Sequence, residues 1–144
     1  MTKEELEQLI SLRAEIEEIK AEIKAIREKP CDIVSDKVQA SSKEFPYTQG
    51  NKVIRGYDTK AMRKKNAKIR DKTMMLEARV KEAEALEIRI TAFINNIHNS
   101  ELRRIFHLRY EKGLTWEQVG RSMHCDRTTA EKRISKYLRE HPEE

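Results

Sequence analysis

Apolar residues recur at helical spacing near the start of the chain. Steps of three and four residues separate the members of this seam, which are Leu9, Leu12, Ile16, Ile19, Ile23 and Ile26. This spacing is typical of a heptad helix, and Thr2 and Glu5 have the spacing of a capping box at its start. Pro30 ends the pattern, so a helix is predicted over residues 1–29. Because one solvated helix cannot bury such a seam, it must pack on another helix of this chain or of a second copy.

The periodicity fails over residues 30–58, where serine, proline and glycine interrupt any regular pattern. An irregular connector is therefore expected. Its apolar residues are too numerous for a pure linker, so a short hairpin or docking on the helices are the two alternatives for part of it. These residues are Phe45, Tyr47, Val53, Ile54 and Tyr57.

A second long helix is predicted over residues 59–97, with Asp58 or Thr59 as its cap. Its apolar stripe comprises Met62, Ile69, Leu76, Val80, Ala83, Ile90, Phe93, Ile94 and Ile97. From Lys60 to Glu82 the sequence has 9 basic and 3 acidic side chains, a net charge of +6. An antiparallel first helix would bring its own C-terminal lysines against this basic half. A parallel arrangement, or pairing with another subunit, is therefore favoured.

Residues 98–144 are predicted to form a compact unit of three short helices. Ser100 is the expected cap of the first helix, and Gly113 is expected to end it. Thr115 and Gln118 form a second capping-box pair, and Asp126 is the expected cap of a last helix that runs to about residue 140. This separation of two short helices is that of a helix-turn-helix.

The turn between the last two helices contains two small residues with expected packing roles. Gly120 is expected where the two helix backbones come closest, and Cys125 fits the small apolar position of the turn. The lone tryptophan, Trp116, is expected to belong to the core rather than to contact a ligand. With Ala130 and Ile134 facing inward, the opposite side of the last helix is polar and basic.

In a helix-turn-helix, the start of the second helix reaches base edges and nearby polar or basic residues hold phosphates. The predicted base contacts are Arg127, Thr128, Glu131 and Lys132. The predicted phosphate contacts are Thr115, Arg121, Thr129 and Lys136. The alternative is a purely structural unit, because capped short helices and charged exposed faces occur in many helical proteins that never bind DNA.

The fold class predicted from these patterns is all-α. Two long helices with heptad-like seams, joined by an irregular connector, precede a C-terminal three-helix helix-turn-helix unit. The composition agrees, since apolar and charged residues each make up 38% of the chain, with only 4 glycines and 3 prolines. The net charge of +5 favours a polyanionic partner, for which double-stranded DNA is the candidate.

The stretch "LRRIFHLRYEKGLTWEQVGRSMHCDRTTAEKRISKYL" resembles the region 4 module of sigma-70-type factors. That resemblance implies an apolar helix ending in Leu-Arg-Tyr, a glycine turn, a short helix and a recognition helix. This chain departs from the pattern at Gly120, His124 and Asp126, where alanine, glycine and serine are usual. His124 must therefore adopt the backbone conformation of the turn, and Asp126 adds a negative charge close to where DNA phosphates would lie.

The connector "VSDKVQASSKEFPYTQGNKVIRGYD", between a heptad helix and a basic helix, resembles the phage-encoded ArpU-type regulators of late transcription. The resemblance covers nearly the whole chain. It implies a cytoplasmic DNA-binding activator of late phage or prophage genes in the bacterial host cell, nucleoid-associated when bound. RNA polymerase and a second copy of the chain are further candidate partners.

Other chemistry finds little support in the sequence. The four histidines and two cysteines lack zinc-ligand spacing, no glycine-rich phosphate loop is present, and no cofactor or enzymatic activity is expected. Without a signal peptide or an apolar run near the ~20 residues of a membrane span, reduced cysteines and no membrane partner are expected. Two alternative functions remain: a DNA-packaging adaptor of the small-terminase kind and a coiled-coil protein-interaction module.

Overall fold

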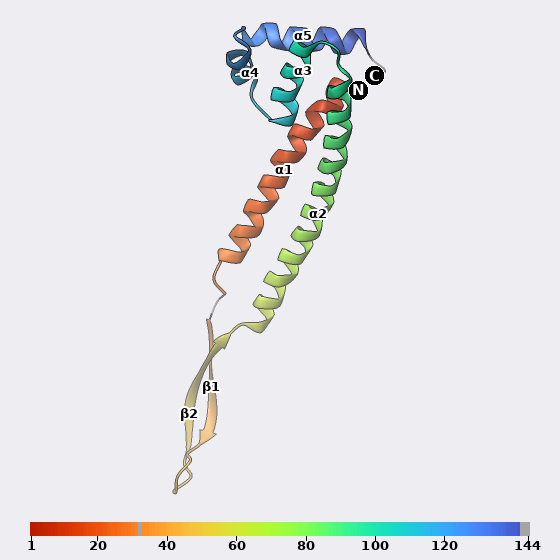
Figure 1. Ribbon diagram of the computed structural model, residues 1–144. Helices are drawn as coiled ribbons and strands as arrows, with labels where there is room; N and C mark the ends of the chain where they lie inside the picture. The colour runs from red at the N-terminus through yellow and green to blue at the C-terminus, as the bar shows by residue number, and fades with distance from the viewer. Residues whose placement is uncertain (32, 142–144) are drawn as a thin grey trace. The chain divides into compact units, whose positions relative to one another are not determined.

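The computed structural model describes residues 1–31 and 33–141, so residues 142–144 of the predicted C-terminal unit lie outside the described chain. Figure 1 follows the elements in order: α1 (Lys3–Glu28), β1 (Ile33–Ser41), β2 (Gln49–Tyr57), α2 (Thr59–Asn96), α3 (Ser100–Phe106), the π-helical turn η1 (His107–Glu111), α4 (Trp116–Met123) and α5 (Arg127–Glu140). The chain divides into two compact units. Unit 1 comprises residues 1–19 and 75–144, and unit 2 comprises residues 20–74.

The prediction of an all-α fold is wrong, because residues 33–57 form an antiparallel hairpin. Of the two alternatives for part of the connector, the structure has the hairpin. Ile33 pairs with Tyr57 at its open end, and Ser41 pairs with Gln49 beside the loop. Valine and isoleucine favour the extended backbone of both strands. Every residue of β2 is exposed, so this strand lacks the alternation of buried apolar and exposed polar positions that would predict it.

The hairpin loop is held by its own backbone. The N–H of Ser42 donates to the carbonyl of Thr48 at 2.9 Å, and the N–H of Thr48 donates to the carbonyl of Pro46 at 2.8 Å. The Phe45–Pro46 peptide bond is cis. The rings of Phe45 and Tyr47 meet edge to face with their centroids 6.1 Å apart. The loop therefore has a defined conformation of its own.

Within unit 1, α1 and α2 pack antiparallel. Arg89 contacts Glu5 at 2.9 Å and Arg79 contacts Glu15 at 2.9 Å, so residues later in α1 meet residues earlier in α2. The preference for a parallel arrangement is therefore wrong. Arginines of α2 meet acidic residues of α1, which gives the antiparallel pair complementary charges.

Within unit 2, the expected repulsion between the basic ends of the two helices is also absent. Lys72 pairs with Glu22, and the Nζ of Lys65 donates to the carbonyls of Arg27 at 2.9 Å and Lys29 at 2.6 Å. The last carbonyls of a helix have no partner in the helix and carry the negative end of its dipole. Lys65 stabilises the end of α1 where like charges were expected to clash.

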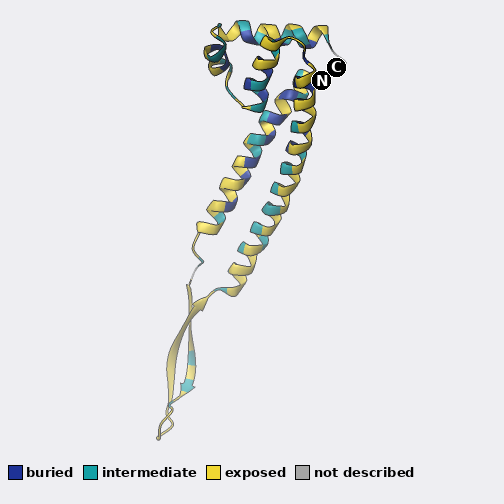
Figure 2. Cartoon of the chain, viewed as in Figure 1, coloured by how far each residue is buried: buried dark blue, intermediate teal, exposed yellow. Residues whose placement is uncertain are grey.

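The core of unit 1 combines both ends of the chain (Figure 2). Leu6 and Leu9 of α1 are 0% exposed and belong to the same buried cluster as Ile90 of α2, Phe106 of α3 and Ile134 of α5. The first turns of α1 therefore complete the core beneath the C-terminal helices. The sequence pattern predicted the seam from Leu9 onward but missed Leu6.

Most helices begin with the N-cap residue that the sequence predicts. At the start of α1, the Thr2 hydroxyl accepts from the Glu5 N–H at 3.2 Å, and the Asp58 carboxylate accepts from the Lys60 N–H at 2.9 Å before α2. At α3 the predicted cap is displaced by one residue. Asn99, not Ser100, accepts from the N–H groups of Glu101 and Leu102, because Ser100 is already the first helical residue and an N-cap side chain accepts from the second and third.

Candidate nucleic-acid interface

The two helices of the helix-turn-helix begin where the sequence predicts. The Thr115 hydroxyl accepts from the Gln118 N–H at 3.3 Å, and the Gln118 side chain accepts from the Thr115 N–H at 2.9 Å, which confirms the capping box of α4. Val119 and Gly120 lie on the buried side of α4. The Thr115 oxygen is thus held in place, while its hydroxyl proton stays available to a phosphate.

The turn after α4 brings the two helices into backbone contact. His124, which was expected to adopt the backbone conformation of the turn, has φ 53°, in the left-handed region, and the Cys125 N–H donates to the Gly120 carbonyl at 3.0 Å. A Cβ at Gly120 would lie 2.7 Å from the Cys125 carbonyl oxygen and 3.1 Å from the Arg127 nitrogen. Gly120 therefore permits the close approach that fixes where α5 begins.

One side of α5 packs inward and the other faces solvent. Ala130, Ile134 and Leu138 are buried, whereas Thr128 and Lys132 are exposed. Asp126 occupies the predicted N-cap position with the extended backbone of a cap, but its side chain makes no cap hydrogen bond within the described chain. Its carboxylate therefore acts at this surface mainly through its charge.

Three of the four predicted base-contacting residues are exposed. These are Arg127, Thr128 and Lys132. Among the residues that the structure describes, neither Arg127 nor Lys132 has an ion-pair partner. Glu131 is half-buried, and its carboxylate lies 4.0 Å from the Nζ of Lys3. The two basic residues are thus available for a ligand, while Glu131 is partly engaged.

The residues predicted to contact phosphates differ in how exposed they are. Thr115 and Arg121 are exposed, and Thr129 is half-buried. Lys136 is exposed and lies 3.9 Å from Glu140 on its own helix. An exposed pair of this kind is worth only about 0.3–0.5 kcal/mol, so a phosphate can replace Glu140.

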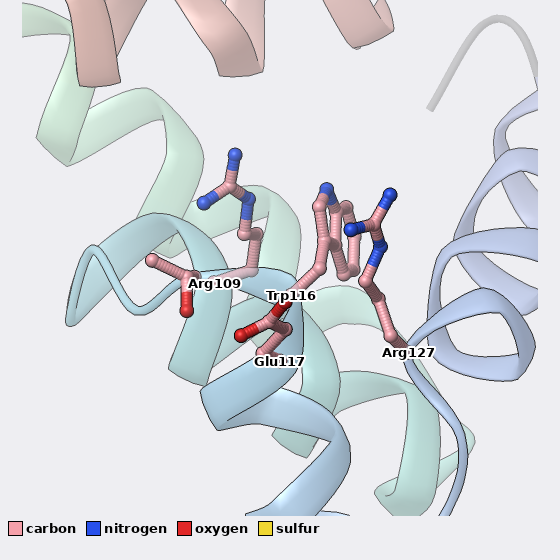
Figure 3. A pocket seen from close by; sticks show the side chains of 5 residues that line it. Arg109, Trp116, Glu117 and Arg127 are labelled. Carbon is pink, nitrogen blue, oxygen red and sulfur yellow. The ribbon is translucent and has the colours of Figure 1, made fainter.

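Two open depressions meet at Arg127. The first, of about 450 Å³, is lined by Arg109, Thr115, Trp116, Glu117 and Arg127. In Figure 3, Arg109 and Arg127 lie on either side of Trp116. The second, of about 640 Å³, extends over the turn and is lined by Glu117, Gly120, Arg121, His124, Cys125, Asp126 and Arg127.

Arg109 and Trp116 are residues of this surface that sequence reasoning did not place in the site. The guanidinium carbon of Arg109 lies 5.0 Å from the Trp116 ring centroid, and Arg109 donates to the Leu114 carbonyl at 2.8 Å. Trp116 packs partly against the core, as predicted, yet it also lines the first depression. No signal in the sequence links Arg109 to Trp116, because only the fold brings them together.

The basic surface also carries acidic groups. Glu117 and Asp126 are exposed and line the depression shared with Arg121 and Arg127. Elsewhere on α5, Arg133 pairs with Glu101 of α3, which ties its charge to the protein. The positive charge open to a ligand is therefore concentrated at the start of α5 and is reduced by two carboxylates.

Beneath this surface, Tyr110 is fully buried. Its hydroxyl has no hydrogen-bond partner within the described chain, and burial raises the pKa of the phenol to about 12. Arg13 of α1 donates to the carbonyls of Tyr110 and Glu111, each at 2.9 Å. These bonds attach α1 to the π-helical turn that precedes α4.

Comparison of the chain with protein-family models, with curated proteins and with solved structures found no match. Within residues 1–31 and 33–141, no cluster of three or more histidine, cysteine or acidic side chains is placed to hold a metal ion. None of the described helices combines the length and the apolar character that crossing a membrane requires.

Proposed function

We propose that the chain is a sequence-specific DNA-binding transcription regulator. The observation that carries this proposal is the start of α5, where exposed Arg127 and Lys132 lack ion-pair partners in the described chain and follow a turn fixed by Gly120. Such a helix presents unpaired donors at its N-terminal turns while its other side is anchored in a core. This is the arrangement by which recognition helices enter the major groove.

Each side chain of the surface has a role in this proposal. Arg127 and Lys132 donate to acceptors on guanine, Thr128 contacts a base edge, and Glu131 accepts from the amino group of cytosine. The phosphates on either side are held by Thr115, Arg121, Thr129 and Lys136. Glu131 must leave Lys3 to do so, which is easy because their 4.0 Å contact is long and exposed.

The biological role in the proposal comes from the resemblance to ArpU-type regulators. It makes the chain an activator of late phage or prophage genes that works in the cytoplasm of the bacterial host, with RNA polymerase as a candidate partner. The two quoted stretches of sequence support this part of the proposal, and the geometry of α4 and α5 is compatible with it.

The coiled-coil interaction module is less well supported than DNA binding. Leu9, Leu12, Ile16, Ile19 and Ile23 are all buried within this chain. The seam that would have paired with another protein is thus already covered. A packaging adaptor of the small-terminase kind would instead be favoured by a ring of subunits in solution.

Selection of bound fragments from a randomised duplex library tests the proposal. We expect the wild-type protein to enrich a motif at about 150 mM salt, close to physiological ionic strength. The double variant R127A/K132A should lose that motif. R133A is the matched control, because it removes an arginine of α5 that is paired with Glu101.

The possible results separate the proposed functions. Loss of the motif in R127A/K132A but not in R133A supports a regulator that reads sequence with the start of α5. Salt-sensitive binding without a motif would instead favour packaging, especially if the protein forms a ring in solution. Absence of duplex binding by the wild-type protein would reject both and leave the interaction module.

A further inference from the structure

The positive charge of the chain lies outside the unit that contains the helix-turn-helix. Unit 2 has 15 basic and 7 acidic residues, a net charge of +8, whereas unit 1 has 15 basic and 18 acidic residues, a net charge of −3. Attraction to a polyanion depends on the number of phosphates that basic side chains neutralise. Unit 1 alone is poorly suited to strong binding, so a contact from unit 2 would supply the missing attraction.

The register of the hairpin in unit 2 sorts its side chains onto two different faces. Directly paired residues share a face, and successive residues of a strand alternate between faces. One face, called here the polar face, carries Ser35, Lys37, Gln39, Ser41, Gln49, Asn51 and Arg55, together with Val53 and the terminal pair Ile33 and Tyr57. The opposite face carries Val34, Asp36, Val38, Ala40, Gly50, Lys52, Ile54 and Gly56.

The two faces differ in chemistry. The polar face has two cations, three side-chain amides and three hydroxyls, and it has no carboxylate. Pairing places Arg55 beside Ser35 and Asn51 beside Gln39. The opposite face is made mostly of small and aliphatic residues, and its single acid and single base cancel in charge. The polar face therefore combines several donors for bases and phosphates, whereas Lys52 is the one basic residue of the opposite face.

We propose that the polar face of the hairpin is a second DNA-binding surface that enters the major groove. The major groove is wide enough for a two-stranded β-ribbon. Arginine pairs with guanine there, and asparagine and glutamine pair with adenine, through two hydrogen bonds each. Arg55, Asn51 and Gln39 are therefore assigned to bases, and Lys37 and Ser35 to phosphates.

The hairpin needs a partner, and charge decides which one fits. A lone two-stranded hairpin is at best marginally stable in water, and every residue of β2 is exposed. Residues 33–57 carry 4 basic and 2 acidic side chains, a net charge of +2 within the unit of +8, so a second copy of the chain would bring like charge against like. Duplex DNA instead offers one negative charge for about every 1.7 Å of its axis. The polyanion is the complementary partner.

This inference rests on the proposed function, and a matched pair of lysines tests it separately. Lys37 lies on the polar face and Lys52 on the opposite face, with Lys52 paired to Val38, the neighbour of Lys37. Duplex binding by full-length K37A and K52A is measured at several salt concentrations. K37A is expected to bind roughly three- to tenfold more weakly, with a salt slope lower by about 1, while K52A binds like the wild type.

The proposed base contacts of the Gln39 and Asn51 amides are tested by the randomised duplex selection. Q39A/N51A is expected to lose some motif positions while keeping those lost in R127A/K132A. Circular dichroism melting of each variant confirms that unit 1 stays folded.

Three results would overturn the inference. Equal losses in K37A and K52A would show attraction without a preferred face, and unchanged affinity in both, with an unchanged motif in Q39A/N51A, would show no contact. A change in subunit number without a change in DNA affinity would show that the hairpin pairs with a second copy. In each of these cases the wild-type motif still supports the proposed function, whereas absence of duplex binding by the wild type rejects both proposals.

Discussion

Tyr110 places a hydroxyl group in the core without a hydrogen-bond partner among the described residues. Its side chain is 0% exposed and its hydroxyl is unpaired within the described chain. A buried donor left unsatisfied is destabilising by about 1–3 kcal/mol relative to a paired one. At the same time the ring packs against Phe106, with centroids 5.9 Å apart. The ring therefore stabilises the core while its hydroxyl weakens it.

Replacing Tyr110 by phenylalanine separates these two effects. At pH 7, Y110F is expected to be as stable as the wild type or more stable by up to about 1 kcal/mol, because only the unpaired hydroxyl is lost. Urea unfolding followed by the fluorescence of Trp116 measures this. A loss of more than about 1 kcal/mol would mean that the hydroxyl has a partner, such as buried water.

The raised pKa of Tyr110 also predicts a dependence on alkaline pH. The phenol titrates near pH 10 in the unfolded chain and at about 12 in the folded one, so the unfolded state releases its proton first. Stability therefore falls as pH rises through this window, by about 1.4 kcal/mol at pH 11. Y110F should lack this part of the decline. All other side chains are the same in both proteins, so parallel curves would contradict the prediction.

Gly120 is the residue that sets the distance between α4 and α5. Alanine would favour the helix by about 1 kcal/mol, but its Cβ would meet backbone atoms, which cannot swing away as a side chain can. The carbonyl oxygen of Cys125 would lie 2.7 Å from it. Overpacking of this kind is destabilising by about 1–3 kcal/mol, so the contact should outweigh the helix propensity.

We therefore expect G120A to lower the melting temperature. S122A is the control, because it raises helix propensity in the same helix without a close contact at position 120. Calorimetry of both variants measures the difference. A higher melting temperature for G120A would show that the turn from His124 to Asp126 can relax.

At the scale of the elements, features with a local signature could be predicted and features that depend on distant partners could not. The capping box of Thr115 and Gln118 and the tight contact at Gly120 are visible in sequence because the interacting residues are few positions apart. The buried seam of α1 follows from its spacing. The hairpin was only one of two alternatives for part of residues 30–58, because β2 is exposed throughout and β1 is partly covered only at Val38 and Ala40, which leaves little alternation to detect.

The orientation of α1 against α2 depended on contacts that no local pattern contains. Lys65 donates to carbonyls of Arg27 and Lys29, 38 and 36 positions away. A count of side-chain charges predicted repulsion there, because it does not include backbone carbonyls as hydrogen-bond acceptors. The same limit applies to the site, where the contact between Arg109 and Trp116 needed the fold.

Asp126 gives a prediction at the scale of α5. Serine is an equally good N-cap residue and carries no charge, so D126S keeps the helix start and removes an anion beside Arg127. Tighter duplex binding is expected, by roughly two- to fivefold at low salt, with little change in stability.

D58S is the matched control for D126S. Asp58 is also an N-cap aspartate, and it accepts hydrogen bonds from Lys60 and Ala61 at the start of α2. Fluorescence anisotropy with a labelled duplex compares the two variants. An equal gain in both would show that the effect is one of net charge and would remove Asp126 from the proposed interface.

At the scale of the whole molecule, the helix-turn-helix shares its core with the other end of the chain. Leu6 and Leu9 complete a cluster that contains Phe106, Val119 and Ile134. Arg13 adds two hydrogen bonds from α1 to η1. The proposed DNA-binding surface of α4 and α5 therefore depends on residues about a hundred positions earlier in the chain.

Leu9 tests this dependence far from any proposed DNA contact. L9A removes a fully buried side chain and should be destabilising by about 2–5 kcal/mol, because the cavity lies in the core that supports α5. Ile88, which is 72% exposed on α2, provides the control, and I88A should have little effect. Trp116 fluorescence reports unfolding of the helix-turn-helix itself, and duplex binding at rising temperature reports its function. In L9A, the unfolding seen by Trp116 fluorescence and the loss of duplex binding should both occur at a lower temperature than in I88A. Equal midpoints would show that residues 98–141 fold without α1, since a helix-turn-helix with a core of its own would not register the loss of Leu9.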